Sequence, residues 1–258
     1  MEKIKTLFNR SIASLTSHEL FAAAVAFFLI DHTGFYFGAG NLWWRIFRAC
    51  GFIWFLPAGY NSGQKGGFRI WMGIAILAVT DQQIGLGLFP LNALATILFI
   101  KFTVDAVMHV ALRSRTAFWL TNAALMALYP LSDQLMEYGT LALLMGIAGW
   151  LLRHQHDESI RKIIDLRLYF VLVAAVYVVA EQVTFQFSTL QLLFVIASTA
   201  WVTAVMYNFK TLLMNSLAQK SPDALSRLCR FIGHKTLEIY VISYLALKAL
   251  FVYALSYN

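Results

Sequence analysis

Residues 27–37, FFLIDHTGFYF, place an aspartate and a histidine inside a long apolar run, and residues 43–48, WWRIFR, follow within one helix length. An apolar run of this length predicts a membrane-spanning helix. Ionisable side chains are costly in the core of a bilayer and usually face a partner or a water-filled cavity. This stretch therefore predicts a functional site built from one acid, one imidazole and two guanidinium groups, those of Asp31, His32, Arg45 and Arg48.

The composition of the chain is that of a membrane protein. Of its 258 residues, 60% are hydrophobic and 13% are charged, whereas soluble domains average roughly 45–50% apolar and about 25% charged residues. In a soluble protein the net charge of +7 would suggest a nucleic-acid partner. Because the basic residues stand in the loops between apolar runs, we interpret them as topological signals and expect the lipid bilayer, not nucleic acid, as the partner.

Long apolar runs predict about nine transmembrane helices, with eight to ten left open, in an all-α polytopic bundle that forms a single domain over residues 1–258. The runs are continuous and do not alternate, which favours helices over barrel strands. The predicted spans are residues 19–38, 42–60, 69–81, 85–109, 116–132, 137–152, 167–182, 188–208 and 235–256.

Every second loop of this scheme is basic. By the positive-inside rule the N-terminus is predicted to be cytoplasmic, and an odd number of spans then puts the C-terminus outside. The larger cytoplasmic loops lie near residues 153–167 and 209–234, and the pattern of the second predicts two short interfacial helices separated by a Ser-Pro-Asp sequence. The basic residues concerned are Lys3, Lys5, Arg10, Lys65, Arg69, Arg113, Arg115, Arg153, Arg161, Lys162, Arg167, Lys210, Lys220, Arg227, Arg230 and Lys235.

The outer ends of four predicted spans share a weak repeat of an acid followed by an amide or imidazole, at intervals of about 50 residues. One explanation is a recurrent hairpin in which the acid caps the next helix or lies in interfacial water. The other is a functional register, because only the first copy carries a titratable imidazole. The four copies are Asp31-His32, Asp81-Gln82, Asp133-Gln134 and Glu181-Gln182.

His32 is suited to general base chemistry, because an ordinary histidine pKa of about 6.5 lets the ring accept and return a proton near neutrality. Consecutive residues of a helix point about 100° apart. Asp31 is therefore expected to orient His32 only if the helix kinks at Thr33-Gly34, and a carboxylate of another span, such as Asp105, would otherwise be needed. A histidine that only hydrogen-bonds within the bundle is the alternative.

Further ionisable residues inside the predicted spans are candidates for contact with a substrate or cofactor. Arg45 and Arg48 are three residues apart and share one helix face, from which guanidinium groups grip phosphate or carboxylate; snorkelling from the helix end is the alternative. Lys101 and Asp105 are four apart, which suits an internal ion pair or a binding role. Lys248 has no local partner and is expected to point inward.

The remaining motifs carry little chemistry. His154 and His156 stand beside Asp157 without a second ligand cluster, so we favour a solvated loop over a metal site and expect no metal. The chain contains no P-loop, GxSxG, HExxH or dinucleotide-binding fingerprint, and ATP hydrolysis and serine hydrolysis are therefore unsupported.

Two stretches resemble a known family. Residues 27–37, then RIFRACGFIWFLPAGYN at 45–61 and FRIWMG at 68–73, are similar to the opening of TraX, the conjugal-transfer family of F-pilin acetylation proteins. Asp31, His32, Arg48 and Arg69 match its pattern, and Arg45 falls where a basic residue is common. The ending GHKTLEIYVISYLALKAL, residues 233–250, resembles the last helix of TraX-like and acyltransferase type 3 membrane proteins. It keeps the tyrosine at Tyr240, but Ser243 stands where the family has a histidine, and Phe47 and Phe52 replace the expected glycine and proline.

The resemblance implies an acyltransferase of the bacterial inner membrane that moves an acetyl group from cytoplasmic acetyl-CoA to an amine or hydroxyl, such as a pilin N-terminus or a surface glycan. His32 would then be the general base and Asp31 its electrostatic partner. Arg48 and Arg69 would bind anionic groups. Two other hypotheses stay open: a transporter or channel for a small anionic or lipid-linked substrate, and a non-catalytic scaffold of a conjugation or secretion complex.

Overall fold

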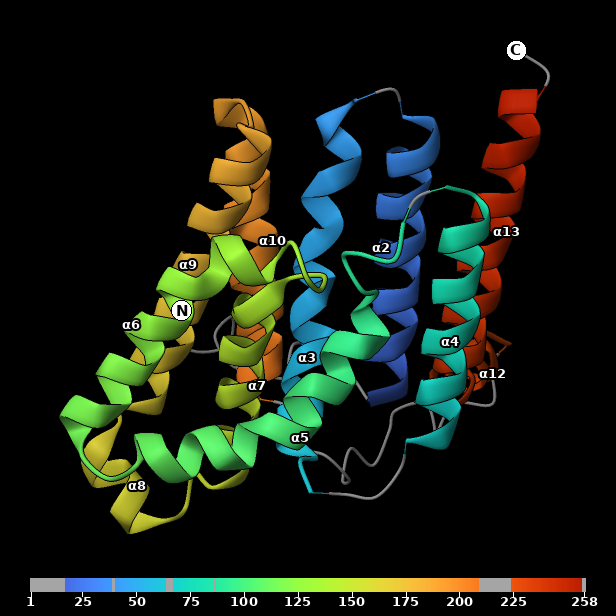
Figure 1. Ribbon diagram of the computed structural model, residues 1–258. Coiled ribbons are helices and arrows are strands. Elements are labelled where there is room, and N and C mark those ends of the chain that lie inside the picture. The colour runs from blue at the N-terminus through green and yellow to red at the C-terminus, as the bar shows by residue number, and fades with distance from the viewer. Residues whose placement is uncertain (1–16, 39, 64–66, 86, 209–223, 257–258) are drawn as a thin grey trace.

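The computed structural model describes residues 17–38, 40–63, 67–85, 87–208 and 224–256 (Figure 1). The predicted all-α class is confirmed for these residues, whose one β-type contact is an isolated bridge between Leu91 and Met136. The first of the two expected interfacial helices falls outside the described residues, as do six basic residues used for the orientation, Lys3, Lys5, Arg10, Lys65, Lys210 and Lys220.

The helices follow the predicted spans closely. The first predicted span corresponds to α2 (Ser17–Phe37). The second corresponds to a 3-10 helix, η1 (Leu42–Cys50), which continues directly as α3 (Gly51–Tyr60). The others are α4 (Phe68–Gln83), α5 (Ala93–Ala111), α6 (Arg115–Ser132), α7 (Gly139–Arg153), α9 (Leu166–Phe185), α10 (Thr189–Tyr207) and α13 (Thr236–Ser256), together with the short helices α8 (Glu158–Ile163) and α12 (Ala224–His234).

Five helices, α2, α5, α9, α10 and α13, are long and apolar enough to cross a membrane. The second predicted span is divided between η1 and α3, neither of which reaches that length alone, although at roughly 2.0 Å and 1.5 Å rise per residue they extend about 33 Å together. The others are shorter or less apolar. The structure thus has the apolar helices of a multi-pass membrane protein, while the count of nine spans and the cytoplasmic N-terminus stay predictions.

The fourth predicted span begins later than expected. Residues 84, 85 and 87–92 lie outside any helix, because Gly85 and Gly87 adopt left-handed backbone conformations. This loop turns into the middle of the bundle, as does the loop of residues 133–138 (Figure 1). The two loops bond to each other, since the Leu91 N–H donates to the Leu135 carbonyl at 2.9 Å and the Glu137 N–H donates to the Leu91 carbonyl at 2.8 Å.

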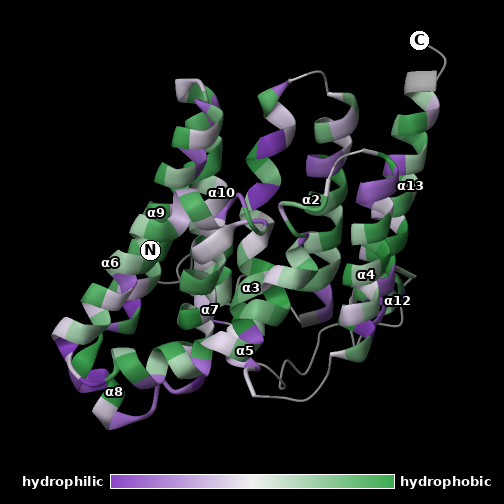
Figure 2. Ribbon diagram, viewed as in Figure 1, coloured by the Kyte–Doolittle hydropathy of each residue, from purple (hydrophilic) through white to green (hydrophobic). Residues whose placement is uncertain are grey.

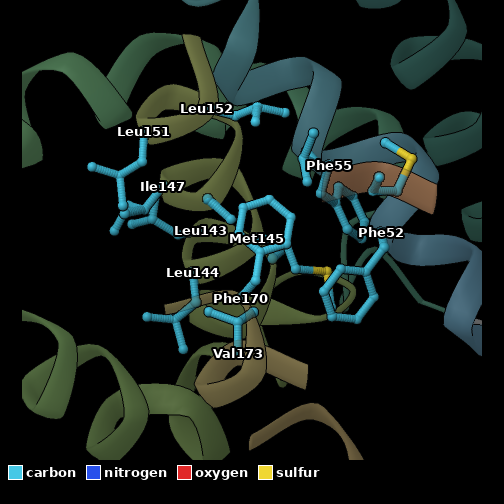
Figure 3. Packing of buried hydrophobic residues seen from close by; sticks show 14 of the residues in the cluster. Phe52, Phe55, Leu143, Leu144, Met145, Ile147, Leu151, Leu152, Phe170 and Val173 are labelled. Atoms are coloured by element: carbon cyan, nitrogen blue, oxygen red, sulfur yellow. The ribbon is translucent and has the colours of Figure 1, made fainter. Parts of the chain in front are cut away.

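Helix α7 forms the centre of the core and packs against α3. Figure 3 shows Phe52 and Phe55 of α3 facing the aliphatic side chains of α7. Glycines bring the two backbones close together: a Cβ atom on Gly59 would lie 1.8 Å from the Gly146 carbonyl oxygen, and one on Gly149 would lie 1.9 Å from that of Leu56. Small residues permit such close crossings in membrane proteins.

The outer faces of the bundle are apolar (Figure 2), with large exposed side chains on α9, α10 and α13 such as Val183, Leu193 and Ile242. Exposed apolar area of this extent fits a lipid environment. The connections from α5 to α6, from α7 to α9 and from α12 to α13, all predicted to be basic, lie at one end of the bundle (Figure 1); we call it the basic end.

Helix α8 lies in the loop predicted near residues 153–167. The Asp157 carboxylate caps it by accepting from the Ser159 hydroxyl at 2.7 Å and from the Ser159 N–H at 2.9 Å. These hydrogen bonds lower the pKa of Asp157 below its usual range.

Candidate functional site

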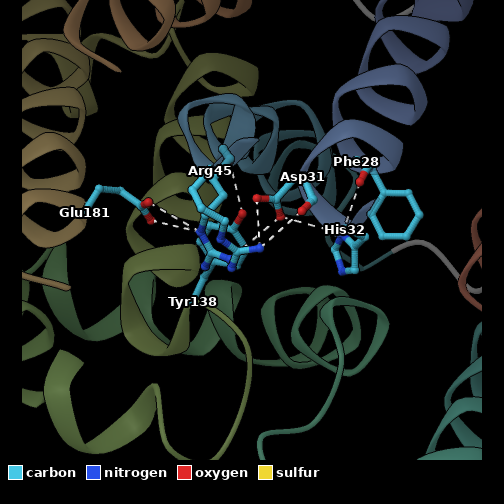
Figure 4. Close-up of polar contacts among 7 residues, drawn as sticks. Phe28, Asp31, His32, Arg45, Tyr138 and Glu181 are labelled. Carbon is cyan, nitrogen blue, oxygen red and sulfur yellow. Dashed lines mark hydrogen bonds and ion pairs between the residues drawn. The ribbon is translucent and has the colours of Figure 1, made fainter. Parts of the chain in front are cut away.

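Asp31 and the two arginines meet as the sequence predicts. The Asp31 side chain is buried on α2, with Arg45 Nη1 3.0 Å from its Oδ1 and Arg48 Nη1 3.9 Å from its Oδ2 (Figure 4). Residues three apart superpose along a 3-10 helix, so η1 presents Arg45 and Arg48 on one face, as predicted. The snorkelling alternative is wrong, because both guanidinium groups turn into the bundle.

The close approach of η1 to α2 depends on a glycine. A Cβ atom on Gly34 would stand 1.9 Å from the Cβ of Trp44, so only glycine lets the Trp44 side chain lie directly on α2. Helix α2 continues through Gly34 to Phe37 without interruption. The kink at Thr33-Gly34 that Asp31 would need in order to orient His32 is therefore absent from this helix.

A second acid comes from α9. Arg48 Nε lies 3.4 Å from Glu181, whose side chain is buried. The Arg48 guanidinium also lies over the rings of Tyr138, at 4.7 Å, and Phe185, at 5.3 Å. The Tyr138 hydroxyl donates to the Arg48 carbonyl at 3.1 Å. Arg48 is thus held between two carboxylates and two aromatic faces, and it links α2, η1 and α9.

The backbone, not a carboxylate, orients His32. Its Nδ1 lies 3.1 Å from the Phe28 carbonyl oxygen and 3.6 Å from Asp31 Oδ2 (Figure 4). A carbonyl can only accept, so Nδ1 carries the proton and the lone pair of the neutral ring lies on Nε2. The imidazole packs against the ring of Phe28, at a centroid distance of 4.1 Å, and against that of Tyr244 of α13, at 5.0 Å. His32 is held in the tautomer that a general base needs at Nε2.

His32 lines a cavity of about 190 Å³. Glu137, on one of the two inward loops, belongs to its wall, and the Ala93 N–H at the start of α5 is bonded to the Glu137 carboxylate. The cavity therefore brings the imidazole of His32 together with both acidic and basic side chains. Its titratable lining consists of His32, Tyr36, Arg45, Arg48, Asp81, Glu137 and Tyr244.

Lys248 of α13 points inward, as predicted, and has a distant partner. The residue is 1% exposed, and its ammonium group is hydrogen-bonded to Asp81 at the end of α4 and lies 3.9 Å from the centroid of the Tyr244 ring. Asp81 is 167 residues away in the sequence, so no local spacing indicated this pair.

The structure places three other expected residues outside the site: Arg69, Lys101 and Asp105. Arg69 is exposed and forms an ion pair with Glu238. Asp105 accepts hydrogen bonds from the Ser62 hydroxyl at 2.8 Å and from Trp150 Nε1 at 2.7 Å; it neither orients His32 nor pairs with Lys101. These corrections share one cause: position along a helix does not say which neighbouring helix a side chain meets.

Lys101 lines a separate cavity of about 340 Å³ with His234. The wall of this second cavity is mainly aromatic and aliphatic and includes Tyr240 of α13. Tyr240 packs on Phe28 at a centroid distance of 4.5 Å, and Phe28 also contacts His32. The rings of Tyr240 and Phe28 thus form a continuous chain of contacts from the wall of the second cavity to the imidazole.

The acids of the repeat have different roles. Asp31, Asp81 and Glu181 pair with basic side chains, so the capping explanation is wrong for these three. It holds for Asp133, whose carboxylate accepts the N–H of Tyr138 at the start of α7. The recurrence of an acid near a helix end was the signal that could have identified Asp81 and Glu181 as site residues.

A comparison of the chain with protein-family models, with curated proteins and with solved structures found no match. Among the described residues, no three His, Cys, Asp or Glu side chains converge in a way that would hold a metal ion.

Proposed function

We propose that this protein is an integral-membrane acyltransferase that moves a short acyl group from a CoA thioester, acetyl-CoA in the simplest case, to an amine or hydroxyl. The observation that carries the proposal is the orientation of His32. Phe28 occupies Nδ1, which leaves Nε2 as the basic nitrogen on a cavity shared with Arg45 and Arg48. A general base must offer its lone pair within reach of the proton that it removes.

The reaction balances with these groups. The acceptor nitrogen or oxygen attacks the thioester carbonyl carbon as its proton passes to His32 Nε2. The carbon–sulfur bond then breaks, and the thiolate takes the proton from the imidazolium. Asp31, 3.6 Å from the ring, stabilises the transient positive charge. The apolar bundle excludes water that would hydrolyse the thioester.

The second cavity suits the donor. A CoA thioester presents a slender arm of limited polarity behind anionic phosphates. In this proposal the arm enters the cavity past Lys101 and His234, near the basic end, and the thioester reaches His32 by displacing the rings of Phe28 and Tyr240. Lys101 thus keeps the binding role expected from the sequence, with a donor group as its ligand.

The resemblance to TraX and to acyltransferase type 3 proteins supports the same reaction, and it suggests a pilin N-terminus or a glycan as acceptor and the bacterial inner membrane as the location. Ser243, which replaces the family histidine, donates to the Ile239 carbonyl at 2.6 Å and so turns back onto its own helix. The proposed mechanism therefore gives it no part in the chemistry.

Release of free CoA tests the proposal. Purified protein in detergent is incubated with acetyl-CoA and a membrane extract as acceptor, and His32→Gln is compared with wild type and with His109→Gln, an exposed histidine of α5. We expect wild-type protein to release CoA only when the acceptor is present. The His32→Gln change should abolish this release and the His109→Gln change should preserve it, and both variants should still bind acetyl-CoA. If wild-type protein neither releases CoA nor binds acetyl-CoA, the proposal that it is an acyltransferase is refuted.

One observation favours the transporter hypothesis as the second candidate. The loops that join α4 to α5 and α6 to α7 enter the middle of the bundle beside ionisable groups, and many transporters build their substrate sites from non-helical backbone at such a depth. Uptake by proteoliposomes of a small anion, without any covalent product, would support transport over acyl transfer.

A further inference from the structure

Tyr244 is the aromatic residue of α13 that faces the imidazole. Its ring lies 5.0 Å from the His32 ring between centroids and 6.0 Å from Phe28. The side chain is 8% exposed and belongs to the wall of the 190 Å³ cavity. Its hydroxyl is therefore a hydrogen-bond donor that shares the His32 cavity but comes from the opposite end of the sequence.

An ion pair holds this ring in place. The Lys248 ammonium lies 3.9 Å from the ring centroid, one helical turn after Tyr244, and Asp81 of α4 binds that ammonium. A cation over an aromatic face is attracted by its quadrupole, and the attraction is strongest where water is excluded. Because Lys248 is buried, the contact between its ammonium group and the Tyr244 ring restricts the orientation of that ring beside His32.

The arginines around the cavity are already engaged, and the Tyr36 hydroxyl, the other phenol of the lining, faces that of Tyr244. Arg45 and Arg48 face Asp31, and Arg48 also faces Glu181. The Ser243 hydroxyl is bonded to its own helix. A phenol keeps its proton near neutrality, since its ordinary pKa is about 10, and tyrosine is one of the side chains that stabilise a developing oxyanion.

We infer that Tyr244 is a second catalytic residue of this site, whose hydroxyl donates a hydrogen bond to the thioester carbonyl oxygen while the acceptor attacks the carbonyl carbon. Asp81 and Lys248 are its positioning residues. The inference rests on the proposed acyl transfer. Tyr244 keeps its proton throughout, because His32 Nε2 takes the proton of the acceptor and returns it to the departing thiolate.

Tyr244→Phe tests the hydroxyl while it preserves the ring and its contact with Lys248. Loss of one oxyanion donor costs about 100-fold or more in kcat, so we expect a decrease of about 100-fold in kcat for CoA release, with acetyl-CoA affinity unchanged. The matched control is Tyr253→Phe, the same chemical change at an exposed position of α13, which should keep full activity.

The positioning role is tested by a double-mutant cycle. Replacing Asp81 by Asn and Lys248 by Met together removes both charges, so that no lone charge stays buried. We expect this pair of changes to lower kcat in the wild-type background and to have no further effect in the Tyr244→Phe background, because it acts through the hydroxyl. Additive effects would show that the pair stabilises the fold only.

Two results would overturn the inference separately from the proposed function. An active wild-type enzyme whose Tyr244→Phe variant keeps its kcat refutes the role of Tyr244 alone, whereas an inactive wild-type protein refutes both proposals. If Tyr244→Phe fails to fold, 3-fluorotyrosine at position 244 keeps the ring and makes the hydroxyl a stronger donor. We then expect a changed kcat, and an unchanged kcat would refute the inference.

Discussion

Gly149→Ala tests the closest contact of the core. The added Cβ atom would lie 1.9 Å from the Leu56 carbonyl oxygen, and ordinary van der Waals contact begins near 3.4 Å, so α7 and α3 must separate by about 1.5 Å. A gap of even 1 Å forfeits about half of a contact's dispersion energy. Overpacking typically costs about 1–3 kcal/mol and occasionally more, and we expect a loss of about 3 kcal/mol because the clash involves two backbones.

The sign of the effect makes this prediction sharp. Without a clash, alanine in place of glycine inside a helix stabilises by roughly 0.5–1 kcal/mol. The assay is reversible unfolding in mixed micelles as the SDS fraction rises, followed by helical circular dichroism. Gly67→Ala is the control, since its nearest neighbour would be a Trp71 side-chain atom at 3.5 Å, and it should change stability by less than about 0.5 kcal/mol. A stabilised Gly149→Ala would refute the close crossing of α3 and α7.

Three further changes test other parts of the molecule. Asp81→Leu leaves the Lys248 ammonium buried without its partner and should cost about 3 kcal/mol. Lys248→Met leaves the more exposed Asp81 carboxylate unpaired and should cost less in the same unfolding assay; an unchanged stability of Asp81→Leu would contradict the pairing. Tyr169→Phe removes the hydroxyl that donates to Asn122 at 2.8 Å and should cost about 1–2 kcal/mol, and an unchanged unfolding midpoint would contradict that bond. Because hydrogen bonds lower the pKa of Asp157, this capping carboxylate stabilises α8 above its ordinary pKa of about 3.9, and the benefit is lost as the pH falls through the lower folded value. A chemical-shift titration of its carboxyl group should have a midpoint below 3.9, and a higher midpoint would refute the cap.

The positions of the helices could be predicted because their signals are local. Long apolar runs marked nearly all of the helical segments, although the fourth span was predicted from residue 85 and its helix begins only at Ala93. The cluster of Asp31 with Arg45 and Arg48 could also be predicted, since these residues lie on consecutive helices joined by a short connection. Such helices usually pack against each other.

The partners of the ionisable groups could not be predicted in the same way. Glu181 reaches Arg48 across 133 residues and Asp81 reaches Lys248 across 167. Asp105 and Arg69 carry the same kinds of charge within similar apolar sequence, yet they lie outside the site. Hydropathy and spacing are alike for the residues inside and outside the site, so neither separates them.

By itself, the sequence determined the all-helical class, the apolar surface and the grouping of Asp31 with Arg45 and Arg48 near the end of the first long helix. These features follow from composition and from contacts between neighbouring segments. Only the tertiary structure decided that Phe28 holds the Nδ1 proton of His32, that Tyr244 faces its ring, that Glu181 pairs with Arg48, and that Lys101 lines another cavity. The reason is physical: an ionisable side chain in an apolar bundle pairs with whichever partner packing brings within a few ångströms, and packing depends on all the helices together.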